Sequence, residues 1–209
     1  MPRRSNHPPD CQFFHVLNRA IQGLVLFEAP SEYRSFLSLL AEAVQRFPAS
    51  VFAYTVMPNH WHVVLQCSSG GSLSQLMHWL GTTHAQRWRG ARGLRGRGAV
   101  YQGRFKSIGV ATDRHFLTVC RYVERNPLRA KLVAWAEEWP WSSVTARTPA
   151  DDAPALAVWP TPRPEPWLEV LNQPEPPAEL REVRRCVRRS LPFGFSAEPD
   201  DSWRTPRFG

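Results

Sequence analysis

The sequence has no long apolar segment. A helix that crosses a membrane needs about 18 or more consecutive apolar residues, and no such run occurs among the 209 residues of this chain. The N-terminal stretch MPRRSNHPPD also lacks the apolar centre of a secretory signal. We therefore expect a protein that does not associate with membranes and is located in the cytoplasm.

Closely spaced cysteines are missing as well. The four cysteines are far apart in the sequence, and none of their spacings is typical of a zinc site. A cytoplasmic chain keeps such thiols reduced, so a redox or zinc protein is a remote alternative. We interpret the thiols as small apolar side chains that are buried, at Cys11, Cys67, Cys120 and Cys186.

Lysine is scarce, although the chain is basic. It has 26 arginine and lysine residues against 18 aspartate and glutamate residues, a formal net charge of +8, and only Lys106 and Lys131 are lysines. The planar guanidinium group of arginine suits phosphate. The charge therefore favours a nucleic-acid partner and an association with the nucleoid. A genome rich in guanine and cytosine is the other explanation for so much arginine.

The spacing of apolar residues predicts an α+β fold. The expected order is strand, helix, strand, strand, helix, strand, helix. The first six elements form a βαββαβ unit, which is typical of the ferredoxin-like core, an antiparallel sheet with helices on one face. Candidate helix caps are Ser31, Ser72 and Thr112. We expect strands at residues 12–19, 50–57, 61–67 and 100–110, and helices at residues 31–47, 72–88 and 112–126.

Composition divides the chain into three parts. Residues 1–147 contain all the elements of this core. Proline is dense from residue 148 to 178, which indicates a linker or an extended wrap around the domain. Residues 179–209 begin with the stretch ELREVRRCVRRS, and we interpret them as a basic C-terminal tail.

Two histidines stand one residue apart in the stretch VMPNHWHVVLQ. Side chains two apart on a strand point to the same face, so His60 and His62 project together, while Trp61 and Val63 face the other way. Two neutral imidazoles are suitable ligands for a divalent metal ion, but such pairs also occur as ordinary surface or core residues. His15 shows no partner of this kind, and we interpret it as structural or solvated.

Tyr122 and Asn126 are four residues apart in the last expected helix, so their side chains lie on one side of it. They fall at the edge of its apolar stripe, neither fully buried nor fully exposed, which suits a reactive group. A tyrosine in such a place is also a common structural residue, so position alone does not decide its role. The stripe consists of Phe116, Val119, Cys120 and Val123.

Several basic residues are candidates for binding a DNA backbone. Arg104 and Lys106 flank Phe105 in an expected strand, so both face one side. A loop rich in glycine and arginine, RGARGLRGRGA at 89–99, precedes them and adds charge. Such contacts fix the register of DNA and make binding sensitive to salt; a solubilising surface is the alternative. Further candidates are Arg95 and Arg97 in the loop, and Arg121, Arg125 and Arg129 on the expected exposed flank of the last helix.

Four motifs follow one another as they do in one protein family: VMPNHWHVVLQ, GRFKS, CRYVERNPLRAKLV and WPWSS. Over roughly residues 12–145 the chain resembles the REP-associated tyrosine transposases, domesticated relatives of the single-tyrosine insertion-sequence transposases within the HUH nucleases. The resemblance implies that His60 and His62 bind Mg²⁺ or Mn²⁺, that Asn126 completes this metal site, and that Tyr122 is the nucleophile. Residues 1–147 would then be an HUH single-tyrosine transposase domain.

The same resemblance implies an activity and a partner. It predicts a metal-dependent endonuclease and strand transferase that acts on single-stranded or hairpin DNA and forms a 5′-phosphotyrosine intermediate. The expected substrate is repetitive palindromic DNA that forms hairpins. The alternative is a domesticated protein that binds DNA hairpins without cutting them. The intact set of four site residues favours the enzyme. The sequence indicates no protein partner.

Overall fold

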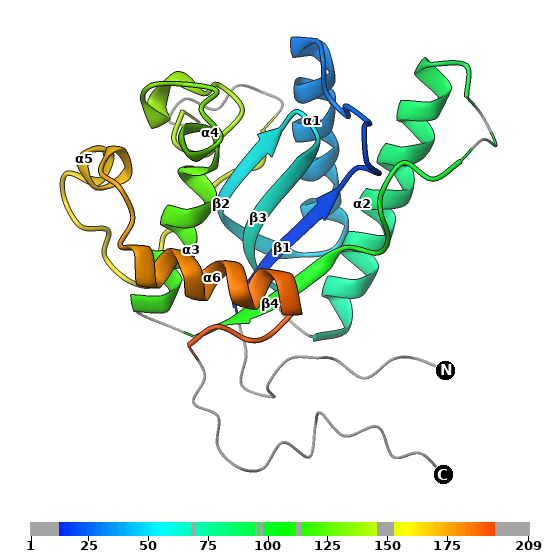
Figure 1. The fold of residues 1–209 in the computed structure, drawn as a ribbon. Coiled ribbons are helices and arrows are strands. Elements are labelled where there is room, and N and C mark those ends of the chain that lie inside the picture. Colours follow the sequence, from blue (N-terminus) through cyan, green and yellow to red (C-terminus); the bar gives the residue numbers. More distant parts are fainter. Residues whose placement is uncertain are drawn as a thin grey trace.

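A four-stranded antiparallel sheet lies at the centre of the protein (Figure 1). The computed structural model describes residues 13–67, 70–94, 96, 98–111, 114–145 and 153–194. The sheet has the order β2-β3-β1-β4, so β1 pairs with two strands that follow it much later in the chain. Its strands are β1 (Phe13–Arg19), β2 (Ala49–Met57), β3 (His60–Cys67) and β4 (Lys106–Val110).

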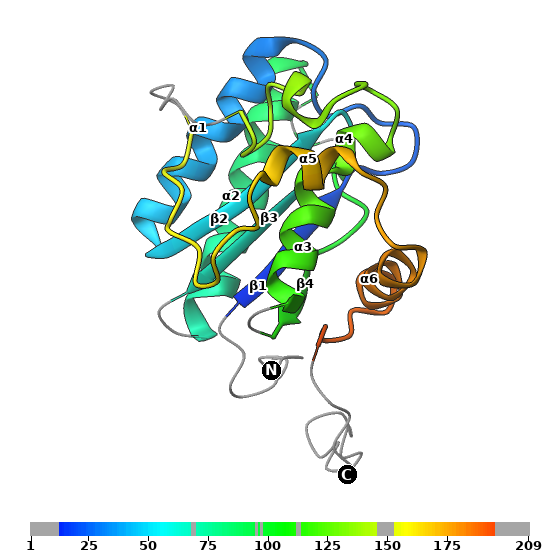
Figure 2. The same ribbon diagram turned by 90° about the vertical axis from the view of Figure 1, so that its left-hand side faces the viewer.

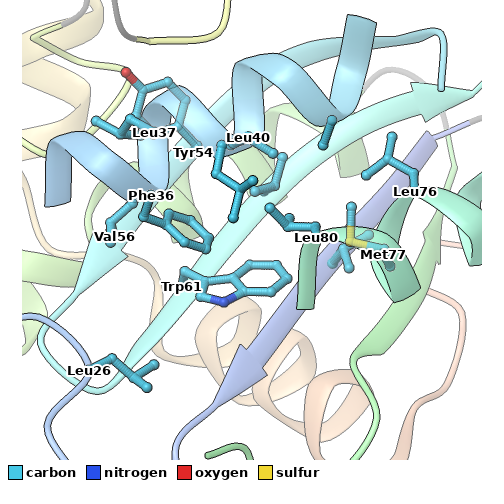
Figure 3. Close-up of a cluster of buried hydrophobic side chains, with 14 of the residues drawn as sticks. Leu26, Phe36, Leu37, Leu40, Tyr54, Val56, Trp61, Leu76, Met77 and Leu80 are labelled. Carbon is cyan, nitrogen blue, oxygen red and sulfur yellow. The ribbon is translucent and has the colours of Figure 1, made fainter. Parts of the chain in front are cut away.

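Helices α1 (Pro30–Arg46) and α2 (Gly70–Ala91) cover one face of this sheet. The order β1-α1-β2-β3-α2-β4 is the one predicted from the sequence. Figure 3 shows the apolar side chains between these helices and the strands. Burying one of them completely contributes roughly 1.5–3 kcal/mol. The fully buried ones include Phe36, Leu40, Trp61, Leu76, Met77 and Leu80.

Helix α3 (Arg114–Glu124) covers the opposite face, as Figure 2 shows. The expectation of helices on one face therefore holds for α1 and α2 but not for the whole molecule. The cause is β2, in which every residue from Val51 to Met57 is buried, so the sheet has two apolar faces to cover. Four short helices complete this side: α4 (Asn126–Arg129), η1 (Ala136–Glu138), α5 (Trp167–Asn172) and α6 (Pro177–Arg189).

The last predicted helix, at 112–126, is divided in two. Helix α3 ends at Glu124, and α4 begins at Asn126. Pro127 explains the break, because a proline has no N–H to donate to the carbonyl four residues before it. That carbonyl, of Val123, instead accepts a hydrogen bond of 2.9 Å from the Thr55 hydroxyl of β2. The break thus ties the end of α3 to the sheet.

The expected helix caps differ from the observed ones. Helix α1 begins at Pro30, and the Glu32 carboxylate accepts hydrogen bonds from the backbone N–H groups of Glu28 (2.7 Å) and Ala29 (3.2 Å), so Ser31 lies inside the first turn. Helix α2 begins at Gly70, before Ser72. Thr112 lies outside the described residues. None of the described helices combines the length and apolar character needed to cross a lipid bilayer.

The segments after α4 cover both edges of the sheet. At the β2 edge, the Val56 N–H donates to the Trp141 carbonyl, and the Ala157 N–H donates to the Val51 carbonyl, at 2.9 and 2.7 Å. At the β4 edge, the Phe193 N–H donates to the Gly109 carbonyl at 2.8 Å. Covered edges protect a sheet from pairing with other chains. The described part of the proline-rich region therefore packs along the domain.

The described cysteines fit the interpretation as packing residues. Cys120 and Cys186 are buried free thiols, and Cys67 is half-buried. Burial raises the pKa of Cys186 to about 11 and the pKa of Cys120 well above its usual value. Both thiols are therefore protonated at neutral pH and are poor nucleophiles. Cys11 lies outside the described residues.

Candidate active site between the sheet and helix α3

Strand β3 presents His60 and His62 to the side of the sheet that α3 covers. The register places Leu17 of β1 and Thr55 of β2 on either side of His62, and the Thr55 hydroxyl bonds to the end of α3. Trp61 points the other way, into the core beneath α1 and α2, as Figure 3 shows. The alternation predicted from the sequence is therefore correct.

Tyr122 of α3 contacts the inner histidine of this pair, His62. The centre of its ring is 6.0 Å from that of His62, and the two rings meet edge to face. The side chain of Asn126 forms a hydrogen bond with the His60 ring. All four residues predicted for the site are therefore brought together, although β3 is distant in the sequence from α3 and α4, which carry Tyr122 and Asn126.

A third imidazole, which the sequence did not indicate as part of the site, belongs to the same cluster. His15 of β1 is buried, and its Nε2 lies 2.8 Å from Nδ1 of His62. Its ring stacks on that of His62 at 5.0 Å and meets the Tyr122 ring edge to face at 5.9 Å. His15 is therefore not solvated, and its burial agrees with the interpretation as a structural residue, but it has a partner that the sequence did not show. A histidine within an otherwise apolar stretch was the available signal.

Burial keeps these imidazoles uncharged. Loss of solvation lowers the pKa of His15 to about 3 and that of His60 to about 4, and nearby Arg129 adds to both effects. The same loss of solvation lowers the pKa of His62 well below its usual value. A neutral imidazole keeps one nitrogen with a free electron pair, which is the form that binds a metal ion.

Hydrogen bonds fix the orientation of both rings of the pair. Nδ1 of His60 lies 2.7 Å from Oδ1 of Asn59; because that oxygen accepts, Nδ1 carries the proton and Nε2 keeps its electron pair. Nδ1 of His62 lies 2.8 Å from Nε2 of His15, and one of these two nitrogens donates to the other. Partners of this kind orient histidines that bind metals. Asn59 is exposed and His60 is half-buried, so the site reaches the surface at the turn between β2 and β3.

The donor set suits a divalent ion that also binds substrate. Among the described residues, no group of three or more histidine, cysteine, aspartate or glutamate side chains is arranged to hold a metal ion. His60, His62 and Asn126 instead provide two imidazoles and an amide. Such a set leaves coordination positions for other ligands, as catalytic sites do and closed structural sites do not.

The arginines of α3 and α4 are not on an exposed flank, contrary to the prediction. Arg125 is 8% exposed, and its Nε donates to the Leu171 carbonyl at 2.6 Å. Arg121 donates to the carbonyls of Gln173 (2.9 Å) and Pro174 (3.3 Å). The physical reason is that the chain returns after the proline-rich region and docks its carbonyl groups on this helix.

Arg129 and Glu175 belong to the same contact. Nη1 of Arg129 lies 2.9 and 3.1 Å from the two carboxylate oxygens of Glu175, and Arg125 binds the same carboxylate at 3.1 Å. The guanidinium carbon of Arg129 lies 4.0 Å from the centre of the Tyr122 ring. No sequence pattern indicated this contact, because Glu175 falls in the region interpreted as linker or wrap.

The remaining basic candidates also differ from expectation. Arg104 is exposed, but it precedes β4, because the chain bulges between Tyr101, which pairs with Ala20, and Lys106, which pairs with Leu17. Lys106 does lie in the strand, and its Nζ donates to the Val187 and Arg188 carbonyls at the end of α6. Two further candidates in the loop, Arg95 and Arg97, lie outside the described residues.

Comparisons with known proteins identify relatives of this chain. The family described as IS200-like transposases matches residues 15–126, more than half of the chain. A solved structure of a REP-associated tyrosine transposase bound to a REP hairpin has a TM-score of 0.56 and 18% identity, and the match covers 77% of this chain and 96% of that one. At this identity the likeness shows a shared α+β fold.

A second solved structure is that of a candidate transposase from Deinococcus radiodurans R1. It has a TM-score of 0.40 and 12% identity, with 63% of this chain and 95% of that chain covered. No curated protein matches the chain.

Proposed function

The chain belongs to the family of IS200-like transposases, which are HUH-type enzymes that act on single-stranded DNA with a divalent metal ion, and we propose that it cuts and rejoins such DNA through Tyr122. One observation carries the proposal. The phenol of α3 and the imidazole pair of β3 face each other, with 6.0 Å between the ring centres of Tyr122 and His62. The catalytic unit is a ferredoxin-like core within residues 1–147.

His60, His62 and Asn126 would hold the metal ion, either Mg²⁺ or Mn²⁺. When bound, the ion supplies positive charge that polarises the scissile phosphate. The contribution of the protein is to keep both imidazoles neutral by burial and to fix their orientation through Asn59 and His15. These contacts support the assignment because a neutral imidazole keeps one nitrogen with a free electron pair, and both rings are held in place by their neighbours.

The Tyr122 oxygen would attack the phosphorus atom in line with the 3′ oxygen of the preceding nucleotide. The O–P bond to tyrosine forms as the bond to the 3′ oxygen breaks; the phenol proton leaves, and the 3′ oxygen takes up a proton. The products are a 5′-phosphotyrosine and a free 3′-OH. Because the ester keeps the energy of the broken bond, the 3′-OH of another strand can reverse the step without ATP.

We propose DNA with a hairpin-forming palindromic repeat as the substrate. The structure of the transposase bound to a REP hairpin supports this choice, since that protein shares the fold. The net charge of +8 suits a polyanionic partner of this kind. Arg104 is exposed beside the bulge that precedes β4, so its guanidinium group is free to contact the DNA backbone.

The test uses single-stranded oligonucleotides that carry inverted repeats from the DNA flanking the reading frame. Each is labelled at its 3′ or its 5′ end and incubated with the protein and Mn²⁺, and the products are separated on a denaturing gel. We expect the 3′ label to migrate with the protein and the 5′ label to remain on a shorter free strand. This asymmetry distinguishes a 5′-phosphotyrosine from a 3′ linkage.

Tyr122→Phe should abolish the covalent adduct and keep DNA binding. Tyr33→Phe is the matched control, because Tyr33 lies on the other face of the sheet, stacked on Trp141 at 4.8 Å. Tight hairpin binding with no adduct for the wild-type protein, with either Mg²⁺ or Mn²⁺, would instead establish the alternative function, a protein that binds hairpins without cutting them.

A further inference from the structure

The face of the Tyr122 ring is covered by a single guanidinium group. The guanidinium carbon of Arg129 lies 4.0 Å from the ring centre, a distance at which a cation is attracted to an aromatic face. Nη2 of the same group donates a hydrogen bond of 2.9 Å to the Tyr122 backbone carbonyl. Arg129 therefore contacts both the side chain and the main chain of one residue.

The position of Arg129 depends in turn on a carboxylate from the distant C-terminal segment. Glu175 accepts Nη1 of Arg129 with both of its oxygens, at 2.9 and 3.1 Å. It also accepts Nη1 of Arg125 at 3.1 Å. The side chains of Glu175 and Arg129 are 6% and 13% exposed, so this ion pair is withdrawn from solvent and is stronger than a surface pair.

A tyrosine nucleophile needs this kind of restraint. Its ring turns about two side-chain bonds, and the attacking oxygen must be held close to the phosphorus atom and in line with the leaving oxygen. His15 and His62 meet the Tyr122 ring edge to face, and Arg129 lies over it. An arginine side chain is itself flexible and loses conformational entropy when it is held in one place, so it restrains the ring only if a partner restrains it.

We propose that Glu175 is a positioning residue for Tyr122, which acts by holding Arg129 over the tyrosine ring. The effect on the orientation of Tyr122 is independent of the reaction, whereas the effect on catalysis rests on the proposed function. The C-terminal segment is then part of the active site, because it contributes the carboxylate that determines the orientation of the nucleophile, Tyr122.

A purely structural role is the competing explanation. Glu175 also joins the segment around residues 171–175 to α3, since Arg125 donates to both Glu175 and the Leu171 carbonyl. Loss of that attachment would lower the stability of the protein without a particular effect on Tyr122. The experiment must therefore observe Tyr122 itself.

The chain has only four tyrosines, Tyr33, Tyr54, Tyr101 and Tyr122, so fluorine NMR of protein labelled with 3-fluorotyrosine gives a simple spectrum. Tyr122→Phe identifies the resonance of interest. In Glu175→Gln, we expect the Tyr122 resonance to shift or broaden while the other three are unchanged. Glu179→Gln is the matched control, because Glu179 pairs with Arg114, whose side chain is 80% exposed, and all four resonances should stay in place.

A folded Glu175→Gln protein with an unchanged Tyr122 resonance would overturn the proposal. If this variant does not fold, Arg129→Lys provides the second test. It keeps the positive charge but lacks the fork that contacts Glu175 and the Tyr122 carbonyl together. It should therefore move the same resonance, and an unchanged resonance would again refute the proposal.

Kinetics provide the catalytic readout. At saturating DNA, Glu175→Gln should slow adduct formation on the order of 10-fold or more, because a misplaced nucleophile loses its alignment, while the Kd for DNA is unchanged. Glu175→Asp, which keeps the carboxylate, should recover part of the rate. An unchanged rate in Glu175→Gln counts against the proposal. If the wild-type protein forms no adduct at all, the proposed function fails, and the fluorine spectra still decide whether Glu175 positions Tyr122.

Discussion

His15 and His62 lie side by side, with 2.8 Å between Nε2 of the first and Nδ1 of the second. The contact joins β1 to β3 on the side of the sheet that faces α3. Both imidazoles are uncharged at neutral pH because burial lowers their pKa values, so one ring donates and the other accepts. His15 thereby restrains the orientation of the His62 ring, and it connects the first strand to the candidate metal site.

Replacing His15 should weaken metal binding more than it changes the fold. His15→Leu removes the partner that orients His62, and loss of such a partner typically lowers metal affinity about 10- to 100-fold. The rise in Tm with added Mn²⁺ measures this affinity without any DNA. His78→Gln is the control, because His78 is an exposed residue of α2. Equal Mn²⁺ affinity in His15→Leu and wild type would show that His15 does not support the site.

The stability of the metal-free protein should fall between pH 6.5 and pH 4. The folded pKa values of His15 and His84, about 3 and about 4, lie below the ordinary value of 6.5 because both rings are buried. In this range the unfolded chain binds protons that the folded chain does not, which favours unfolding. Above pH 6.5 both states are neutral, so the contribution is constant there.

Each such histidine changes the free energy of unfolding by up to about 1.4 kcal/mol per pH unit. Urea denaturation at several pH values measures the slope. In His15→Leu we expect the slope of the free energy of unfolding against pH to decrease by the contribution of one histidine. In His78→Gln this slope should be unchanged. A slope in His15→Leu equal to that of the wild type would mean that His15 is protonated in the folded protein.

Local pattern predicted which candidate side chains share a face, and the family resemblance predicted that the two groups meet. Alternation along β3 placed His60 and His62 on one face and Trp61 on the other, and helical spacing placed Tyr122 near Asn126. The βαββαβ order followed from the same periodicities. His15 could not be assigned in this way, because its contact with His62 depends on the register between β1 and β3, which no spacing within either strand reveals.

The arginines show the other limit of sequence reasoning. Helical spacing correctly grouped Arg121, Arg125 and Arg129, but it could not reveal that the group is covered. Their partners are mainly backbone carbonyl groups and the Glu175 carboxylate, which the chain brings back after a long proline-rich region. Every residue has a backbone carbonyl, so its position as a hydrogen-bond partner cannot be read from the sequence. Only the tertiary structure shows that these arginines are bound by groups of the same chain.

Glu124 should be a strong determinant of stability. Its carboxylate is buried in α3 and accepts hydrogen bonds from the Ser143 hydroxyl at 2.6 Å and the Trp167 indole N–H at 2.7 Å. In Glu124→Gln the charged acceptor is lost and one oxygen becomes an NH₂ donor, so the Ser143 hydroxyl must change from donor to acceptor or the Trp167 N–H loses its acceptor. We expect a loss of about 1–3 kcal/mol in the free energy of unfolding, measured by denaturation with urea.

Glu137→Gln is the matched control for this change. Glu137 accepts a hydrogen bond of 2.9 Å from Asn172, but the contact is exposed, and water can replace it, so the loss should be within about 0.5 kcal/mol. Equal stability of the Glu124 and Glu137 variants would show that the two segments that carry Ser143 and Trp167 dock independently of this carboxylate.

Exposure should separate the basic residues that bind DNA from those that hold the protein together. Arg104 is exposed just before the start of β4, whereas Arg121 donates hydrogen bonds to the Gln173 and Pro174 carbonyls. Arg104→Gln should weaken binding of single-stranded DNA and reduce the dependence of log Kd on log salt concentration by about 0.7, the share of one phosphate contact. Arg34→Gln, an exposed change on α1, is the control and should have neither effect.

Arg121→Gln should behave in the opposite way. It removes a donor from two backbone carbonyls of the C-terminal segment, so it should lower the free energy of unfolding by about 1 kcal/mol and leave the salt dependence of DNA binding unchanged. A smaller salt dependence in Arg121→Gln would mean that the segment at residues 173–174 leaves α3 when DNA binds, because only then is this guanidinium free to meet a phosphate. Fluorescence anisotropy with a labelled oligonucleotide at several salt concentrations measures both variants.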